Sequence, residues 1–383
     1  MDSSRETFCS GLFLSARWFI VSAVAKKDIH LIVLPNREAA EYCSADLYNL
    51  VEGDRVFFLP DSGNAIERSN YKSSLGVQRT AAVGKVMNPG EGPLFIVTYP
   101  EALAELVVSK KKFEERSMQL HVGDVQEVTA LEQKLREFGF QEVDYVYEPG
   151  QFALRGSILD IYSFSHELPF RVDFFGNEVD SIRTFEVESQ LSRERRDAIE
   201  IVPELAATST ELIPFVKFLP PETVLAAKDF SFVSDTISRI YREGFSSQAM
   251  TERLEGATEM EKQQVMKEMN AERHLITGTQ FDADTECFRH VFFGLKSPEK
   301  ADAKVRCDIT PQPLFHKNFE LLIPALQDYL QKGYKLYILA DSQKQQERLK
   351  DIFDSLTTTT QHPSSNTQIT FTPVDHTLHD GVR

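Results

Sequence analysis

Residues 150–189 read GQFALRGSILDIYSFSHELPFRVDFFGNEVDSIRTFEVES, and this stretch decides the fold class of the middle of the chain. Apolar and polar side chains alternate, as in strands with one buried face, along residues 150–162, 169–175 and 178–188. Gly176 and Asn177 form a typical two-residue hairpin turn between the last two runs. Because a helix is expected just before them, over residues 125–139, the pattern predicts a small α+β domain with an antiparallel meander.

The run FRVDFF, residues 170–175, distributes its side chains over two faces of the sheet. Alternation turns the first, third and fifth side chains toward the core, so that Arg171, Asp173 and Phe175 share the opposite face. A large aromatic residue beside an arginine on the wet side of a sheet is typical of an interface anchor. The alternation leaves a second interpretation equally open, in which a neighbouring helix covers Phe175.

The N-terminal third of the chain alternates strand and helix patterns. Short apolar runs predict buried parallel strands over residues 29–34, 56–59 and 94–98. Asn36 is a suitable N-cap for the helix after the first run, and Pro100 occupies the favoured first position of a later helix. This succession predicts an α/β domain whose sheet is covered by helices on both faces.

The C-terminal third returns to α/β patterns with longer connections. We expect strands over residues 224–227 and 335–339, and helices over residues 247–275, over residues 318–330 and after a capping box of Ser342 and Gln345. The many charges of residues 247–275 are interpreted as a solvated helix face rather than a binding surface. These elements predict a second α/β domain.

The composition limits the classes of protein that this chain can belong to. A length of 383 residues predicts two or three domains, at about 150 residues per domain. Hydrophobic residues make up 42% and charged residues 26%, which excludes a wholly disordered, collagen-like or membrane-spanning chain. With 42 basic and 58 acidic residues the net charge is −16, so the chain should repel nucleic-acid phosphates. The best local exception, the lysines at 110–112, is interpreted as a solvated helix end where lysines suit the helix dipole.

The cysteine pattern and the N-terminal segment favour a cytoplasmic protein. No C-x-x-C motif indicates a zinc ribbon or a redox dithiol among the four cysteines, Cys9, Cys43, Cys287 and Cys307. Residues 11–25 are apolar, but Arg17 interrupts them, and they are shorter than the roughly 20 residues that span a bilayer. The residues before them lack the basic start of a signal peptide. We therefore expect a buried helix here and no contact with a membrane.

A nucleotide-binding loop of the form G-x-x-x-x-G-K-[ST] is missing from the sequence. The nearest match is Gly84-Lys85, but Arg79 stands where the first glycine is needed, and Val86 replaces the Ser or Thr. Without that loop, backbone N–H groups cannot surround a phosphate in this manner. We therefore expect no ATP hydrolysis, and no catalytic or cofactor-binding residue, in this segment.

Two weaker patterns have simpler interpretations. Residues 69–72, SNYK, match S-x-x-K without the other motifs of that enzyme class, and we interpret them as a coincidence. Residues 375–380, DHTLHD, contain two histidines, but a frayed chain end explains them better than a metal site. We therefore predict no metal ligand.

The stretch from residue 150 to residue 189 resembles domain 2 of the excision-repair protein UvrB and of the transcription-repair coupling factor (Mfd) family. It contains F-x-x-R-G-x-x-x-D-[IL] from Phe152 and R-x-[DE]-F-F-[GD]-x-E-[VI] from Arg171. Weaker similarity to the coupling factor extends over VFFLPDS, YKSSLGVQRTAAVGKVM, LFIVTYPEAL and the region from NFELL to ILADSQKQQERLKDIF. The missing phosphate-binding loop favours the coupling factor over UvrB, whose loop is intact.

The resemblance implies a UvrB-like module of two helicase-like α/β domains with a smaller inserted α+β domain. It implies a first α/β domain with a degenerate phosphate-binding loop over residues 1–118, an α+β domain over residues 119–204 and a second α/β domain over residues 205–383. It also implies a fragment of a longer protein. The family continues into a polymerase-interaction domain and a double-stranded DNA translocase, whose motor uses ATP and Mg.

For function, the resemblance implies a module that recruits UvrA and links RNA polymerase stalled at DNA lesions to nucleotide excision repair. The family's UvrA contact positions correspond here to Arg155, Arg171 and Phe175. Arginine can bind a carboxylate through two hydrogen bonds, and a flanking aromatic ring excludes water from them. Two alternatives stay open. Arg155 could form an ion pair within its own domain, and the chain could be a divergent or UvrB-type ATPase fragment acting on damaged DNA.

Overall fold

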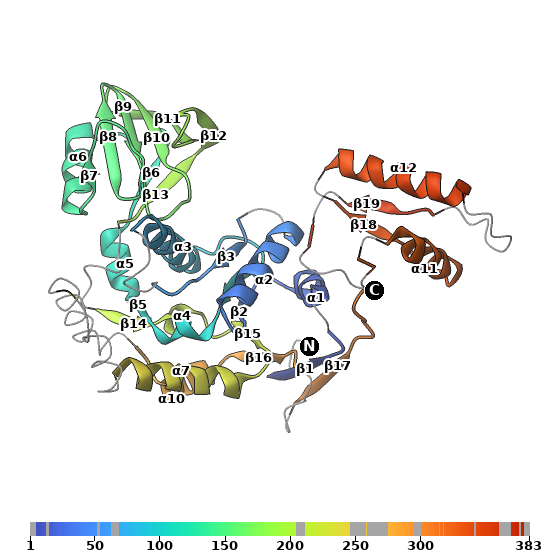
Figure 1. Ribbon diagram of the computed structural model, residues 1–383. Coiled ribbons are helices and arrows are strands. Elements are labelled where there is room, and N and C mark those ends of the chain that lie inside the picture. Colours follow the sequence, from blue (N-terminus) through green and yellow to red (C-terminus); the bar gives the residue numbers. More distant parts are fainter. Residues whose placement is uncertain are drawn as a thin grey trace. The chain divides into compact units, whose positions relative to one another are not determined.

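The chain folds into two compact units in a computed structural model (Figure 1). The structure describes residues 5–12, 15–51, 54–62, 69–203, 211–245, 258, 275–294, 301–313, 315–316, 318–340, 342–359, 369–374 and 377–378. The first unit comprises Met1–Phe8, Ala25–Glu41 and Asp54–Lys304, and the second comprises Cys9–Val24, Tyr42–Gly53 and Val305–Arg383. Within the first unit, one parallel sheet and one mainly antiparallel sheet make the fold mixed α/β.

The larger sheet has seven strands in the order β17-β1-β16-β15-β2-β4-β3, and the six strands from β1 to β3 in that order run parallel. Its strands are β1 (Glu6–Ser10), β2 (Ile29–Val33), β3 (Val56–Phe58), β4 (Leu94–Thr98), β15 (Val224–Ala227), β16 (Arg289–Phe292) and β17 (Ala303–Arg306). The expected strands at residues 29–34, 56–59, 94–98 and 224–227 are confirmed within one residue. All five residues of β2 and of β4 are buried, as expected for parallel strands covered on both faces.

One expectation about this sheet is wrong. A second α/β domain beginning at residue 205 would separate β15 and β16 from the N-terminal strands, whereas β15 lies between β2 and β16. The physical reason is that an apolar strand such as VLAA needs a hydrogen-bonded neighbour on each side and cover on both faces. The first sheet supplies both. The other domain junctions stay predictions.

Helices and short strand pairs accompany this sheet along the chain. They are α2 (Arg37–Leu50), α3 (Ser69–Met87), α4 (Pro100–Ala104), α5 (Lys110–Arg116), α7 (Phe230–Phe245), α10 (Gly278–Thr285), the 3-10 helix η1 (Phe215–Phe218), and the antiparallel strands β5 (Leu106–Val108) and β14 (Leu212–Pro214). Asn36 caps α2 as expected, since its Oδ1 accepts a hydrogen bond of 2.9 Å from the N–H of Ala39. Pro100 occupies the first position of α4.

The lysine run at residues 110–112 forms the first turn of α5, not its last. The expected match between these lysines and the helix dipole is therefore wrong, because the dipole favours negative charge at an N-terminus. The helix start is supported instead by Ser109, whose hydroxyl accepts from the N–H of Lys112. Lys112 also forms an ion pair of 2.6 Å with Glu115, as a solvated helix surface would.

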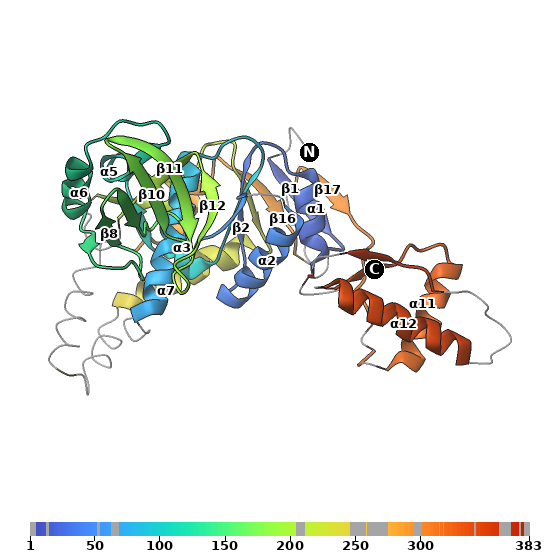
Figure 2. The ribbon, with the colours of Figure 1, turned by 90° about the horizontal axis from the view of Figure 1, so that it is seen from above.

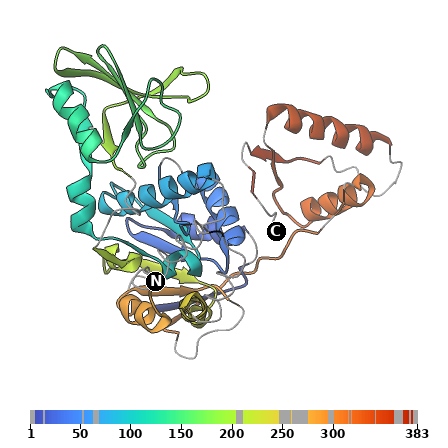
Figure 3. The same ribbon diagram turned by 60° about the vertical axis from the view of Figure 1, so that its left-hand side comes forward.

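The α+β domain is a helix packed on a six-stranded sheet of order β12-β11-β10-β9-β8-β7 (Figures 1 and 3). Its elements are β6 (Met118–His121), α6 (Val128–Glu137), β7 (Gln141–Glu142), β8 (Gln151–Arg155), β9 (Ile158–Ile161), β10 (Phe170–Phe175), β11 (Glu178–Phe185), β12 (Ser192–Arg196) and β13 (Ala198–Ile201). Strands β8 to β12 form the expected antiparallel meander, while β6 and β13 pair separately. Leu131 and Leu135 of α6 join the core under the sheet.

Turns divide this domain more finely than expected. The single strand expected over residues 150–162 is wrong, because the chain reverses at Gly156 and forms the hairpin of β8 and β9. Gly156 has φ 63°, a left-handed conformation that glycine adopts without steric strain. The hairpin turn at Gly176 and Asn177 is confirmed between β10 and β11. Helix α6 is shorter than the expected range of 125–139, although Gly139 does end it.

The second unit contains a small α/β layer of its own. The second unit contains α1 (Ala16–Val24), and the layer consists of α11 (Phe319–Gln331), β18 (Tyr337–Leu339), α12 (Gln343–Thr359) and β19 (Thr372–Val374). Strands β18 and β19 pair in parallel, and α11 and α12 lie on opposite sides of them (Figure 1). Ile323, Phe353 and Ile369 form the core of this layer.

Several expectations about this unit have clear outcomes. The hydroxyl of Ser342 accepts from the N–H of Gln345 at 3.4 Å, so the expected cap of α12 is confirmed. The N-terminal helix is confirmed as α1, but only Ala16 and Trp18 are buried, so the expectation of a buried helix is only half right. None of the helices that the structure describes is both long and apolar enough to cross a membrane. The helix expected over residues 247–275 lies outside the described residues, apart from Thr258 and residue 275. Both histidines of residues 375–380 also lie outside them, since only residues 377 and 378 of that stretch are described.

Candidate interaction face of the α+β domain

The sheet of the α+β domain has a core face and an outer face, and β10 shows the alternation most clearly. Phe170, Val172 and Phe174 are each at most 5% exposed and pack in the core, as the alternation predicted. Phe175 is 82% exposed, which excludes the alternative that a neighbouring helix covers it. A phenylalanine that keeps this much of its surface in water is available to a partner.

Asp160 is the centre of the outer face. It lies on β9, in register with Ala153 of β8 and Arg171 of β10, and it is fully buried. The Nε of Arg171 donates to Oδ1 of Asp160 at 2.7 Å, and its Nη2 donates to Oδ2 at 2.8 Å. Arg155 donates from Nη2 to the same Oδ2. One buried carboxylate therefore holds two guanidinium groups from the strands on either side of it.

This triad fixes Arg171 more firmly than a surface contact would. The side chain of Arg171 is only 16% exposed, and its guanidinium lies 4.5 Å from the ring centre of buried Phe185. Its Nη1 donates to the backbone carbonyl of Gln190 at 3.1 Å. The hydrogen bonds to Asp160 raise the pKa of Arg171 above its ordinary value. Breaking such a buried pair leaves an uncompensated charge, so Arg171 supports the domain as well as the face that it lies on.

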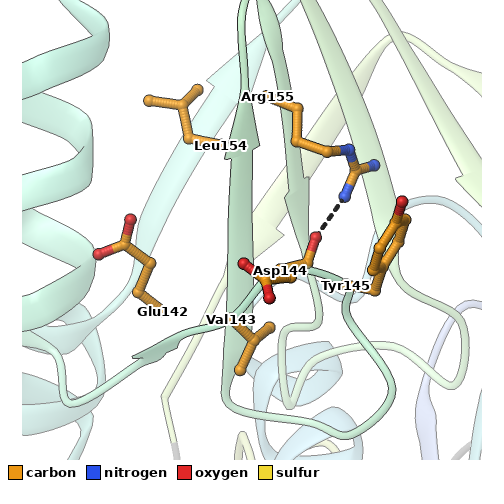
Figure 4. A pocket seen from close by; sticks show the side chains of 6 residues that line it. All are labelled: Glu142, Val143, Asp144, Tyr145, Leu154 and Arg155. Atoms are coloured by element: carbon orange, nitrogen blue, oxygen red, sulfur yellow. Dashed lines mark hydrogen bonds between the residues drawn. The ribbon is translucent and has the colours of Figure 1, made fainter.

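Arg155 occupies the wall of an open cleft of about 570 Å³ (Figure 4). Its Nη1 donates to the backbone carbonyl of Asp144 at 2.9 Å, and its guanidinium lies 5.0 Å from the ring centre of Tyr145. The cleft is lined by Glu142, Val143, Asp144, Tyr145, Leu154 and Arg155. The side chain of Arg155 remains 34% exposed. The expected alternative, an ion pair of Arg155 within its own domain, is therefore confirmed, but part of the guanidinium still reaches solvent.

The structure brings two of the three expected contact residues together and leaves the third apart. Arg155 and Arg171 meet at Asp160, whereas Phe175 follows Arg171 by four residues on β10, about 13 Å further along the strand. The pairing of β10 with β11 shifts register between Asp173 and Phe174. The extra residue is Asp180 on β11, so the alternation of β10 continues unbroken to Phe175.

Sequence reasoning did not assign a role to Asp160, although it stands inside the quoted F-x-x-R-G-x-x-x-D motif. It also missed the ion pair between Arg183 of β11 and Asp173 of β10. The usable signal was a carboxylate in a strand flanked by apolar residues, because such a group is rarely buried without a cationic partner. The partner itself depends on cross-strand register, which one sequence does not reveal.

Comparison with known proteins finds a family that is similar to this part of the chain. Residues 118–206 match the family model described as the UvrB interaction domain. We refer to this segment below as the UvrB interaction domain, after the family model that it matches.

Relatives extend the likeness beyond that domain. The chain is 33% identical over 206 residues to the transcription-repair-coupling factor of Bacillus subtilis (strain 168), covering 53% of this chain and 17% of that protein. It is 45% identical over 74 residues to the Escherichia coli (strain K12) protein of the same name, covering 19% of this chain and 6% of that protein. The protein of that name from Staphylococcus aureus (strain bovine RF122 / ET3-1) is 27% identical over 198 residues, 51% of this chain and 17% of its own length. The matched region thus spans less than a fifth of each relative.

Outside the UvrB interaction domain, the nearest match to a phosphate-binding loop lies within a helix. Gly84 and Lys85 belong to the last turns of α3, so their N–H groups lie inside a helix and not at its open N-terminus. Arg79, also on α3, is 8% exposed and donates to the backbone carbonyl of Pro60 at 2.7 Å. Residues 69–72 form the first turn of the same helix. Among the described residues, no three His, Cys, Asp or Glu side chains gather as metal ligands would.

Proposed function

We propose that this UvrB interaction domain binds UvrA, and that the chain is the UvrA-recruiting part of a transcription-repair coupling factor. The observation that carries the proposal is Phe175, 82% exposed on a domain of this family, on the strand that also carries Arg171. Relatives named transcription-repair-coupling factor support the wider role. In that role the module links RNA polymerase stalled at a DNA lesion to nucleotide excision repair.

The wider proposal concerns the whole protein of which these residues would form the first part. Its motor would be an ATP-dependent, Mg-requiring translocase on double-stranded DNA, carried by segments other than this one. The UvrB-like arrangement, in which the UvrB interaction domain is inserted into a helicase-like α/β domain, belongs to the same proposal. The return of the chain from β13 to β15 of the parallel sheet supports an inserted domain.

The three contact residues take different parts in this proposal. Phe175 contributes apolar surface that is removed from water when the partner binds. Arg155 offers the exposed part of a guanidinium that is already oriented by Asp160 and Asp144. Arg171 is a positioning residue, because its hydrogen bonds to Asp160 and Gln190 hold the outer face in one geometry. Such preorganisation reduces the entropy lost on association.

Titration calorimetry of the purified chain with UvrA tests the proposal, with Phe175→Ala as the decisive variant. Truncating a central anchor typically costs about 2 kcal/mol, which corresponds to a Kd about 30-fold weaker. Phe232→Ala is the matched control, since Phe232 is a 47% exposed phenylalanine on α7. The control should bind like the wild type. Absence of binding by the wild-type chain would overturn the proposal, and equal binding by Phe175→Ala would remove Phe175 from the site.

A further inference from the structure

Three arginines stand directly opposite one another on neighbouring strands of the UvrB interaction domain. Arg171 of β10 pairs in register with Arg183 of β11, and Arg183 pairs in register with Arg195 of β12. Figure 2 shows these strands side by side. Like charges at directly opposite positions destabilise a sheet. We call this row of three the arginine ladder, and its arrangement requires negative charge nearby.

The two inner members of the arginine ladder have such charge within the domain. Arg171 is paired with buried Asp160, and Arg183 is paired with Asp173, which also accepts a hydrogen bond of 3.2 Å from Ser181. The side chains of Arg183 and Asp173 are 33% and 21% exposed, so this second pair is also partly withdrawn from water. Neither inner arginine is free to take a partner's carboxylate without losing one of its own.

Arg195, the outer member of the ladder, differs from every other arginine of its strand. Arg193 pairs with Glu186, and Arg196 pairs with Glu194 at 2.9 Å. Arg195 is exposed, and no described residue forms an ion pair or a side-chain hydrogen bond with it. Strand β12 is the last strand of its sheet, so Arg195 also lies at an open edge. The charge on this edge is therefore uncompensated within the described part of the domain.

The acidic residues nearest to β12 are already paired, Glu186 with Arg193 and Glu194 with Arg196, and two others lie away from Arg195. Glu178 and Asp180 stand near the start of β11, beside the hairpin that carries Phe175. Asp180 precedes Arg183 by three residues, which corresponds to about 10 Å along a strand. The outer face is thus divided, with acidic groups beside Phe175 and an open guanidinium at the end of the ladder.

We infer that Arg195 is a further binding residue for the partner, and that it receives a carboxylate from an acidic patch on UvrA. The inference rests on the proposed function. A carboxylate placed there forms charge-assisted hydrogen bonds with Arg195 and reduces the repulsion along the arginine ladder. The overall charge of −16 repels an acidic partner elsewhere, so a local cation also fixes the orientation in which UvrA can dock.

The test measures UvrA binding by the whole chain with Arg195→Glu, and with Arg239→Glu as the control. Arg239 lies on α7 outside the UvrB interaction domain, its side chain is 53% exposed, and the control makes the same change in net charge. We expect Arg195→Glu to weaken the Kd by about 10-fold to 100-fold, the range for a lost hydrogen bond to a charged group. Arg239→Glu should change it by less than about 2-fold. Raising the NaCl concentration should weaken UvrA binding by the wild type more steeply than UvrA binding by Arg195→Gln. Salt screens the ion pair made by Arg195, and the variant cannot make that ion pair.

The outcomes separate this inference from the proposed function. If the wild type binds UvrA and Arg195→Glu binds equally well, the inference fails while the proposed function stands. If Arg195→Glu and Arg239→Glu weaken binding alike, the effect is one of net charge, and the inference also fails. If the wild-type chain does not bind UvrA, the proposed function fails and the inference fails with it. Arg195 is exposed, and no described residue pairs with it, so its substitution should not lower the thermal unfolding midpoint.

Discussion

The two sheets of the first unit place polar groups in opposite ways. The parallel sheet uses both faces for packing, and all five residues of β2 are buried. The sheet of the UvrB interaction domain packs one face into its main core and carries charged side chains on the other, beside a small buried cluster of Val146, Ala153 and Phe185. A face that is not needed for the core can carry recognition, and a sheet covered on both sides cannot. The candidate site therefore lies on the antiparallel sheet.

A buried ionisable group on each sheet makes the difference concrete. His30 on β2 is 8% exposed, and burial lowers its pKa to about 4, so that it is neutral near pH 7. Asp160 on β9 is fully buried, and two guanidinium groups compensate its charge. A neutral histidine can be buried in the parallel sheet without a charged partner. Pairing with arginine suits a face that has to present arginines in fixed positions.

The largest effect is expected from Asp160→Ala, which tests whether pairing is essential on the second sheet. The substitution leaves Arg155 and Arg171 without their shared carboxylate, and breaking a buried pair in this way costs about 3–5 kcal/mol. Hydrogen exchange should show that much loss in the opening free energy of β9 and β10, with little change in β2.

Asp180→Ala is the matched control for this prediction, since Asp180 is exposed on the same sheet. It should change the opening free energy by less than about 0.5 kcal/mol. A loss below about 1 kcal/mol in Asp160→Ala would mean that the triad is not needed for the fold. Arg171 could then act as a simple partner contact.

The alternation of residues predicted the faces of these sheets but not the partners on them. The strands at 94–98 and 224–227, and the buried side of FRVDFF, follow from local patterns because burial imposes a period of two or a continuous apolar run. The hairpin at Gly156 escaped because its turn is only two residues long, and the core positions merely shift from Phe152 and Leu154 to Leu159 and Ile161. The place of β15 beside β2 and the pairing of Arg171 with Asp160 depend on non-local register. For the site, the sequence indicated the face and its exposed Phe175, while the internal engagement of Arg171 required the structure.

An intermediate effect is expected from acid, and it tests the parallel sheet. The pKa of His30 falls from 6.5 to about 4 on folding, chiefly through burial, with Asp28 raising it and Arg289 lowering it. The unfolded chain therefore binds more protons between these values, and stability is lost as the pH falls from 6.5 to 4. The loss attributable to His30 should be up to about 3 kcal/mol, since each pKa unit corresponds to 1.36 kcal/mol.

Comparison of His30→Phe with the wild type isolates this contribution. The Nε2 of His30 has no hydrogen-bond partner among the described residues, and its ring stacks on Phe95, so phenylalanine should be accepted without loss of a polar contact. Urea titrations at pH 7 and pH 4.5 should show a smaller acid loss in His30→Phe. His121→Gln, at a histidine with a 53% exposed side chain, should retain the wild-type loss. Equal acid losses in all three proteins would contradict the assignment to His30.

The smallest effect is expected at Glu200, which lies on β13 of the UvrB interaction domain. Unlike Asp160, it has no arginine partner among the described residues. No described residue pairs with its carboxylate, which lies close to Gly84 of α3, and burial raises its pKa. The folded state then binds the proton more tightly than the unfolded state, so this group's contribution to stability declines as the pH rises from 4.5 through the raised pKa. Glu200→Gln should increase stability at pH 7 by no more than about 1 kcal/mol, since solvent screens a half-buried group. The gain should disappear near pH 4, where both proteins are uncharged at this position.

A loss of stability at pH 7 would show that the charge of Glu200 is compensated after all. A carboxylate on this domain would then need no arginine partner, and the contrast with Asp160 would fail.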